Sequence, residues 1–280
     1  MSKITISVDN TSDLGEELYK KHDLEVIYFG AVIGDELFID KDVTPEDIYK
    51  AVEVEGTLPK TNAALEIDYR ELFERATKDG GSVIHFSMSD KMSASHQNAL
   101  RAAIGLQNVY VIDTKSACAG TGILAIKASE LRAQGKSVKE ILKIIQPMVD
   151  KINVGFIIND LNYLYRGGRA SGLKLLGANI LKIRPSLTVN KEGRIVPDRK
   201  FKGKFEQAVI EWTEFKIEKA RTANKDLAFV CYSDIDNGVL LGVVTALKKA
   251  GFKEVQRIKV GTTLTIHLGR NALGVIFLDA

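Results

Sequence analysis

The densest group of side chains that could do chemistry lies between Ser87 and His96, in the segment Ser-Met-Ser-Asp-Lys-Met-Ser-Ala-Ser-His. This segment joins an apolar strand-like run to a helical pattern. Hydroxyls and backbone N–H groups at a helix start hold an anion without a cationic side chain. A nucleophilic Ser93 near His96 is the competing chemistry, but the segment lacks a G-x-S-x-G elbow, so a hydrolase is the less favoured interpretation.

Two other polar residues, Thr61 and His267, stand out by their surroundings. Thr61 follows Pro59-Lys60 before a helix that begins near Glu66, so it presents a hydroxyl from a loop or serves as an ordinary turn or capping residue. His267 alternates with apolar neighbours as on a strand, where a lone histidine is more often structural. At neutral pH its ring can nevertheless donate a hydrogen bond to a carboxylate.

The tripeptide Gly167-Gly168-Arg169 ends a helical pattern and then presents a guanidinium. Two glycines tolerate a positive φ at a helix end, and a guanidinium can bind a carboxylate or phosphate through two parallel hydrogen bonds. With Arg166 and Lys174 nearby, a solvated basic surface is an equally weighted interpretation.

A basic cluster, made of Arg199, Lys200, Lys202 and Lys204, surrounds Phe201. Such a run is usually a solvated surface. As a functional feature it would dock an acidic partner protein. Contact with nucleic acid is less favoured, because neither a recognition helix nor an aromatic stacking platform accompanies the cluster.

Strand-like runs alternate with helical patterns in the first half of the chain and predict βαβ units with a mainly parallel sheet. The predicted strands cover residues 4–8, 24–29, 82–86, 108–112 and 154–158. Thr44-Pro45 and Ser137 with Glu140 predict helix starts, and the chain is expected to be helical on both sides of Gly135. The polar turn from Asp9 to Leu14 ends the first strand, either as a ligand-binding edge or as a simple cap and turn.

The pattern changes near Asn159, so we predict an N-terminal α/β domain over 1–158 and a C-terminal α/β domain over 159–280. The second domain is expected to hold a mixed sheet, with a hairpin turn at residues 190–193, helices over 205–221 and 235–249, and strands over 227–232, 255–260 and 275–278. Without a linker the two domains should touch and leave a ligand-binding cleft.

Composition narrows the function classes. A net charge of +3 over 280 residues does not by itself indicate nucleic acid. The sequence contains neither an apolar run of about 18 residues nor a signal-peptide core, which indicates a cytoplasmic protein. Cys118 and Cys231 lack metal or redox spacing and are expected to be core residues. The small residues at 117–126 leave room for a ligand tail or pack a helix closely on a sheet.

The order of several segments resembles the DegV family over nearly the whole chain. The segments are Asp9–Leu14, the Pro59/Thr61 loop, the serine-rich turn ending at Ser93, Leu161–Arg169, Leu181–Pro185 and His267-Leu268-Gly269. The chain departs from the family at Asn62, at Ala94 and after Gly269, where Arg270 would bring a cation near the site.

This resemblance implies a carrier that holds one long-chain fatty acid between its domains, with no other cofactor and no metal. The acyl carboxylate would meet Thr61, Ser93 and His267, and the head-group region would include Asn62, Ala94, Gly168 and Arg169. A separate ATP-dependent fatty-acid kinase subunit would phosphorylate the carboxylate to an acyl phosphate. The carrier itself would catalyse nothing.

Other parts of this expectation concern partners. The basic cluster would dock the kinase, transient contact with a membrane surface is allowed, and nucleic acid is not an expected partner. The sequence lacks the G-x-x-x-x-G-K-[ST] loop of many ATP-binding proteins. The alternatives are a Ser-His hydrolase or a small-molecule transferase at the domain cleft, and a regulatory protein that binds nucleic acid through the basic cluster.

Overall fold

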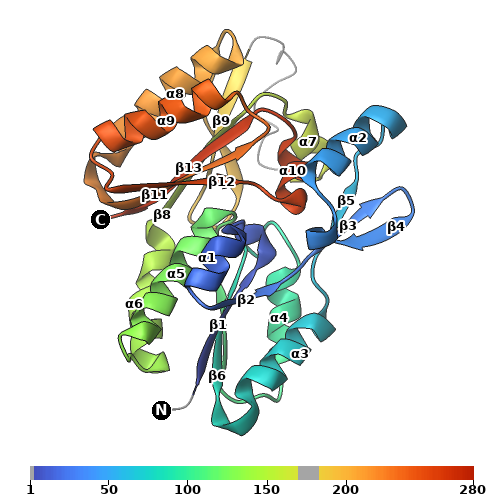
Figure 1. Ribbon diagram of the computed structural model, residues 1–280, viewed down its shortest axis with the longest axis vertical. Coiled ribbons are helices and arrows are strands. Elements are labelled where there is room, and N and C mark those ends of the chain that lie inside the picture. The colour runs from blue at the N-terminus through green and yellow to red at the C-terminus, as the bar shows by residue number, and fades with distance from the viewer. Residues whose placement is uncertain (1–2, 170–182) are drawn as a thin grey trace.

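Four strands pair as a fully parallel sheet in the order β2-β1-β6-β7 in the computed structural model, which describes residues 3–169 and 183–280 (Figure 1). These strands are β1 (Ile4–Asp9), β2 (Leu24–Ile27), β6 (Ser82–Ser87) and β7 (Val109–Asp113). All six residues of β6 are buried, because helices cover both faces of the sheet. A strand that packs on both faces is mostly apolar, and β6 keeps three apolar residues in its centre while Ser82, His85 and Ser87 are buried polar residues.

The covering helices begin and end close to the predicted signals. They are α1 (Gly15–Lys21), α3 (Glu66–Thr77), α4 (Ser95–Ala103), α5 (Ala119–Ala133) and α6 (Val138–Met148). At the start of α6, the Ser137 hydroxyl accepts from the Glu140 amide, and the Glu140 carboxylate accepts from the Ser137 amide at 2.9 Å. This capping box and the left-handed Gly135 confirm the predicted break between two helices.

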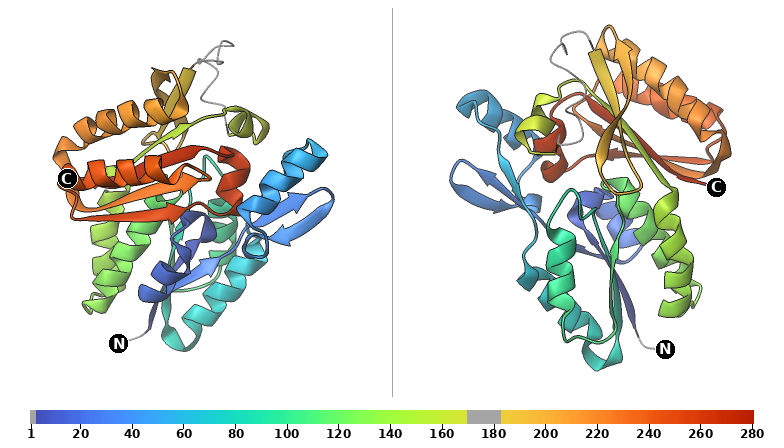
Figure 2. Two further views of the ribbon diagram at one scale, coloured as in Figure 1. Left: turned by 45° about the horizontal axis from the view of Figure 1, so that its top comes forward. Right: turned by 180° about the vertical axis from the view of Figure 1, so that it is seen from behind.

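Six strands form the second large sheet, in the order β10-β9-β8-β13-β11-β12. They are β8 (Ile152–Ile158), β9 (Ile183–Val189), β10 (Ile195–Lys202), β11 (Ala223–Ser233), β12 (Glu254–Lys259) and β13 (Ala272–Asp279). Only β11 and β12 pair in parallel among them. Helices α8 (Phe205–Lys219) and α9 (Asn237–Lys249) cover its outer face (Figure 2). The expected α/β class and mixed second sheet are therefore confirmed.

Strand β8 differs from the expectation in its pairing. The sequence grouped residues 154–158 with the parallel strands, but β8 pairs antiparallel with β13 and β9 in the second sheet. A buried apolar strand looks alike in either sheet, so its own sequence does not specify its neighbours. The boundary between domains 1–158 and 159–280 stays a prediction, and the strand that ends at Ile158 belongs by pairing to the second sheet.

A small antiparallel sheet stands beside the two large ones (Figure 1). It consists of β3 (Gly30–Ile33), β4 (Glu36–Ile39) and β5 (Lys60–Asn62). The turn η2 (Asp40–Asp42) and helix α2 (Pro45–Glu55) connect β4 to β5, and Thr44 caps α2 as predicted. Thr61 therefore lies on the short strand β5 and not in a loop, paired with Ala31.

His267 lies on a helix, which corrects the prediction of a strand. Helix α10 (Thr262–Leu268) is preceded by Gly261 and followed by Gly269, and every residue from Thr262 to Ile266 is buried. The alternation of apolar and polar residues does not indicate here which side of the segment is buried, because the segment is enclosed on nearly all sides. Tertiary packing overrides the local strand preference of its threonines and isoleucine.

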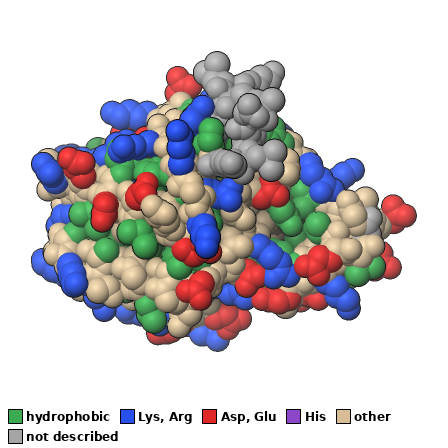
Figure 3. Space-filling model, turned by 90° about the horizontal axis from the view of Figure 1, so that it is seen from above, with side chains coloured by type: hydrophobic (Ala, Val, Ile, Leu, Met, Phe, Trp, Pro, Cys, Tyr) green, Lys and Arg blue, Asp and Glu red, His purple; other side chains and the backbone are tan. Residues whose placement is uncertain are grey.

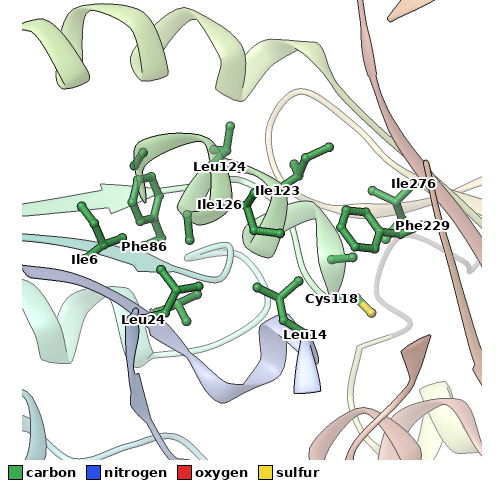
Figure 4. Close-up of a cluster of buried hydrophobic side chains, with 14 of the residues drawn as sticks. Ile6, Leu14, Leu24, Phe86, Cys118, Ile123, Leu124, Ile126, Phe229 and Ile276 are labelled. Carbon is green, nitrogen blue, oxygen red and sulfur yellow. The ribbon is translucent and has the colours of Figure 1, made fainter. Parts of the chain in front are cut away.

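One hydrophobic cluster joins the two large sheets (Figure 4). Leu14 and Cys118 from the first half of the chain meet Phe229 and Ile276 from the second sheet. Within the described ranges, no helix is long and apolar enough to cross a bilayer. The sheets are thus held together by a shared core beside which the candidate site lies.

Candidate ligand-binding site

A cavity with an empty volume of about 940 Å3, part of it open to solvent, lies between the two large sheets. Its wall combines the serine-rich turn after β6, the residues just before α5, strands β8, β11 and β13, and helix α10. Most of the lining is apolar, and the few polar groups include Thr61, Ser93, Arg169 and His267. A concave apolar site with a small polar set is the usual form of a small-molecule pocket.

Thr61 and His267 meet across 206 residues of sequence. The Thr61 hydroxyl lies 3.1 Å from Nε2 of His267, so β5 and α10 present these side chains to the same part of the cavity. Nδ1 of His267 is buried, and no described residue provides it with a hydrogen-bond partner. The ring therefore has one nitrogen occupied by a hydroxyl and one unsatisfied.

Burial lowers the pKa of His267 to about 3, and the nearby positive charge of Arg169 acts in the same direction. The imidazole is consequently neutral at physiological pH, with one nitrogen able to donate and the other able to accept. A neutral ring suits hydrogen bonding to a ligand. It is a poor general base, because its affinity for a proton is too low near pH 7.

Arg169 connects two predicted segments of the site. Its Nε donates to the carbonyl of Met92 at 3.1 Å, and its Nη1 donates to the carbonyl of Gly167 at 2.8 Å. Helix α7 (Asn162–Arg166) ends just before these residues, and burial lowers the pKa of the guanidinium. The structure thus brings the Gly-Gly-Arg segment against the serine-rich turn at the cavity wall.

Gly167 is required by the approach of the histidine ring. Its φ of −75° is available to any residue, but an added Cβ would lie 2.3 Å from Nδ1 of His267. Gly168 differs, because its φ of +73° favours glycine while nothing lies within 4 Å of an added Cβ. The two neighbouring glycines therefore serve different purposes.

Ser93 precedes α4 and faces the cavity. Its hydroxyl accepts from the Ser95 amide at 3.1 Å, and its backbone amide donates to the Ser89 carbonyl. His96 is not its partner, since Nδ1 of His96 lies 2.7 Å from the hydroxyl of the fully buried Ser87. The serine and histidine that are close in sequence are thus engaged separately.

Four residues expected near the head group lie off the cavity wall. Asn62 ends β5, Ala94 is exposed at the start of α4, and Gly168 is exposed beyond α7; among the described residues, none of the three lines the cavity. Arg270 pairs with Asp234 and with Glu53, and it stacks on the Tyr49 ring at 4.0 Å. Its cation is directed to these partners, which corrects the expectation that it adds a charge at the site.

The sequence did not identify the sulfur-containing part of the wall. Both cysteines are buried, as predicted, but Cys118 and Cys231 also line the cavity together with Met88 and Met92. The pKa of the Cys118 thiol is raised mainly by a hydrogen bond with Cys231 and, to a smaller extent, by burial. Its sulfur therefore stays a neutral thiol. Apart from Ala117 and Cys118, the described residues of the 117–126 stretch pack against the fold, with Leu14 tight against Gly122.

The polar turn after β1 is structural. Asp9 accepts from the Tyr69 hydroxyl at 2.7 Å and from the Met88 amide at 2.9 Å. The Ser12 hydroxyl pairs with that of Tyr19 and does not cap α1. This turn therefore supports the serine-rich segment through Asp9, and the side chains of Asp9 and Ser12 are engaged in internal hydrogen bonds.

The basic cluster lies away from the cavity, on the edge strand β10 and at the start of α8. Its members Arg199, Lys200, Lys202 and Lys204 are all exposed, and the Arg199 guanidinium stacks on Phe201 and Phe215. Lysines on an edge strand also discourage pairing with another chain. Lys174 and residues 181–182, which the sequence also singled out, lie outside the described residues.

A family model of uncharacterised proteins of the DegV family matches residues 3–280. This chain belongs to the DegV family. A DegV domain-containing protein of Clostridium perfringens is 27% identical over 289 aligned positions, covering 99% of this chain and 98% of the relative.

Solved DegV structures share the fold. A fatty-acid-binding DegV protein of Thermus thermophilus superposes with a TM-score of 0.91 at 24% identity, over 99% of this chain and 100% of that one. A DegV lipid-binding protein of Thermotoga maritima gives 0.82 at 26% identity, over 99% and 98%. DegV proteins thus bind fatty acids in known structures.

Proposed function

We infer that this DegV protein is a carrier that holds one long-chain fatty acid in the cavity between its sheets. What supports this proposal is that Thr61, Ser93, Arg169 and His267 line one mostly apolar cavity, in which the Thr61 hydroxyl lies 3.1 Å from Nε2 of His267. The acyl carboxylate binds at Thr61, Ser93 and His267, and Arg169 supports it. Asn62, Ala94 and Gly168 do not contact the ligand in this proposal. They belong to the head-group region because their backbone carries the neighbouring residues Thr61, Ser93 and Arg169.

The apolar wall supplies the affinity. Transfer of about 15 methylenes from water at roughly 0.8 kcal/mol each gives on the order of 12 kcal/mol before the costs of binding. Met88 and Met92 are flexible and polarizable, so they adapt to the shape of the acyl chain.

The head-group region supplies orientation without a strong ion pair. A carboxylate must be hydrogen-bonded when it leaves water. Hydroxyls and a neutral histidine meet that need, while Arg169 is already engaged by the Met92 and Gly167 carbonyls. A carboxylate held in this way keeps oxygen lone pairs available for reaction with a phosphoryl donor.

That donor belongs to a separate partner in this proposal. An ATP-dependent fatty-acid kinase subunit phosphorylates the bound carboxylate to an acyl phosphate in the cytoplasm, and the carrier itself is not an enzyme. Arg199, Lys200, Lys202 and Lys204 dock the partner, and membrane contact is limited to lipid exchange. On the face seen in Figure 3, basic and acidic side chains are interspersed, which argues against a continuous nucleic-acid-binding surface.

A Ser-His hydrolase or a transferase at the same cavity is the alternative, and the geometry does not favour it. The hydrogen bonds of His96 and His267 go to Ser87 and Thr61. With a pKa of about 3, His267 would not withdraw a proton from Ser93 near neutral pH.

The test is native mass spectrometry of the protein purified from cells, followed by denaturing extraction of the bound molecule. We expect one fatty acid per chain. Ser93→Ala and Thr61→Val should retain the fold and lose about tenfold in fatty-acid affinity, equivalent to one or two hydrogen bonds. An empty protein that takes up no added fatty acid, or covalent labelling of Ser93 by a serine-directed phosphonate, would contradict the carrier.

The docking role has its own test. Replacement of Lys200, Lys202 and Lys204 by Glu should leave the dissociation constant for fatty acid unchanged and reduce kinase-dependent acyl-phosphate formation, because the cluster is remote from the cavity. The matched control replaces the exposed Lys248 and Lys249 at the end of α9. If both variants formed acyl phosphate equally well, the docking role would be contradicted and the cluster would be only a solvated surface.

A further inference from the structure

The start of helix α10 is held by the first half of the chain. The Gly261 amide donates to the carboxylate of Asp13, and the Thr262 hydroxyl donates to the carbonyl of Val43 at 2.5 Å. The Thr263 amide donates to Oδ2 of Asp40 at 2.7 Å. Three successive residues that lead into or open the helix thus bind acceptors from the opposite half of the protein.

Asp40 is the central acceptor in this arrangement. It receives both the amide and the hydroxyl of Thr263, and its own backbone amide donates to the carbonyl of Phe29 at 2.8 Å. The side chain is 7% exposed, and Asn10 adds a further hydrogen bond. Since Gly261 makes no side-chain cap, Asp40 provides the cap that the helix does not provide for itself.

The other end of α10 carries His267, whose Nε2 meets Thr61 on β5. A helix of seven residues rises only about 10 Å, so a change at its first turn reaches the histidine directly. Between the two ends, Ile266 packs with Ala31 and Val43 of the small sheet region. The helix is therefore fastened at both ends to the same part of the first half.

We propose that Asp40 is a positioning residue of the head-group site: by holding the first turn of α10 across the two halves of the protein, it sets His267 against Thr61. Asp40 does not contact the ligand in this proposal and acts only through the helix. The proposal rests on the assignment of His267 to the head-group site.

The first readout does not depend on any ligand. In the native protein His267 is buried and has a pKa of about 3. If Asp40→Ala releases α10, the ring gains solvent and its pKa moves upward toward the ordinary value near 6.5. Histidine NMR over a pH series measures this shift, with His22 and His96 as internal references.

The second readout separates positioning from general stability. Dissociation constants are measured for palmitic acid and for hexadecanol, which have the same chain length and different head groups. We expect Asp40→Ala to weaken the acid about tenfold and the alcohol much less. Asp40→Asn keeps an acceptor oxygen for the Thr263 amide but removes the charge, so it should weaken the acid roughly threefold, between the native protein and Asp40→Ala. Asp42→Asn, at an exposed carboxylate of the same turn, is the matched control and should change neither quantity.

The outcomes are distinct. An unchanged His267 titration together with an unchanged ratio of the two affinities in Asp40→Ala would overturn the positioning role. If that variant does not fold, Asp40→Asn decides by the same measurements, because a smaller shift in the same direction is still required. If the native protein binds no fatty acid, the carrier assignment fails while the His267 titration still tests what Asp40 does.

Discussion

His85 and His267 sit in two regions that contain the same residue types and behave differently. Nδ1 of His85 lies 3.0 Å from the Ser7 hydroxyl, the Asp9 carboxylate is close by, and the rings of Tyr69 and Phe73 enclose it. His267 has a threonine on one nitrogen, an unsatisfied second nitrogen among the described residues, and a cavity in front of it.

This difference shows what distinguishes a structural polar cluster from a binding site. Ser7, Asp9 and His85 are each fully buried, so no ligand can reach them even though they contain the residue types of a catalytic triad. The polar groups of the site at His267 instead line a cavity. Nε2 of His85 also has no hydrogen-bond partner among the described residues. Accessibility to a ligand, rather than residue type or remaining hydrogen-bonding capacity, therefore separates the two regions.

The test with the largest expected effect replaces each of the two histidines by alanine. His85→Ala should lower the free energy of unfolding by about 3 kcal/mol, because it leaves a cavity and removes the partner of Ser7. Its effect on fatty-acid affinity should be small. His267→Ala should cost about 1 kcal/mol of stability and weaken fatty-acid binding about tenfold. Urea unfolding and titration with a fluorescent fatty acid measure both quantities.

The reverse pattern would break the comparison. If His267→Ala destabilised the fold as much as His85→Ala while leaving affinity unchanged, both histidines would be structural. His96→Ala serves as the control of the same residue type, because His96 is bonded to the buried Ser87 next to the serine-rich turn. It should resemble His85→Ala.

The sequence predicted the class of fold well, because that information is local. Thr44 and Ser137 carry complete capping signals, and both helices begin where those signals lie. Strand β8 was grouped with the wrong neighbours, and α10 was predicted as a strand, because partner choice and enclosure depend on distant segments. Local propensity does not contain those contacts.

The candidate site was predicted mainly through the family resemblance. The residues alone did not place Thr61 beside His267, since 206 residues separate them. Asp40 gave no signal, because an aspartate after a strand is also a common turn residue. Cys118 and Cys231 were read correctly as core residues, but a core residue and a cavity-lining residue have the same sequence pattern.

Substitutions of the neighbouring glycines Gly167 and Gly168 test the His267 site with a smaller loss of stability. Gly167→Ala should displace the His267 ring, because the new Cβ would lie 2.3 Å from Nδ1, and fatty-acid affinity should fall severalfold to about tenfold. Gly168→Ala should instead lower stability by about 1 kcal/mol through its left-handed φ, with little change in affinity. Equal effects of the two variants on affinity would remove the steric role of Gly167.

The last contrast concerns pH. Because the folded-state pKa of His267 is about 3 and the unfolded value is near 6.5, the unfolded chain binds a proton first as pH falls. The contribution of His267 to stability is therefore present above pH 6.5 and is lost progressively between pH 6.5 and 3. Burial lowers the pKa of His22 and His96 as well, so the native protein must be compared with a variant.

His267→Gln, which cannot titrate, is that variant. In urea unfolding of the ligand-free protein at about pH 7, 5.5 and 4.5, which covers the upper part of this range, its stability should fall less steeply than that of the native protein, by up to about 1 kcal/mol per pH unit. The same substitution at His96 should have a smaller effect, because the charges of Asp113 and Asp90 oppose the lowering of its pKa. Parallel curves for the native protein and His267→Gln would mean that the ring is solvated in the cavity, and the neutral-histidine account of head-group binding would then fail.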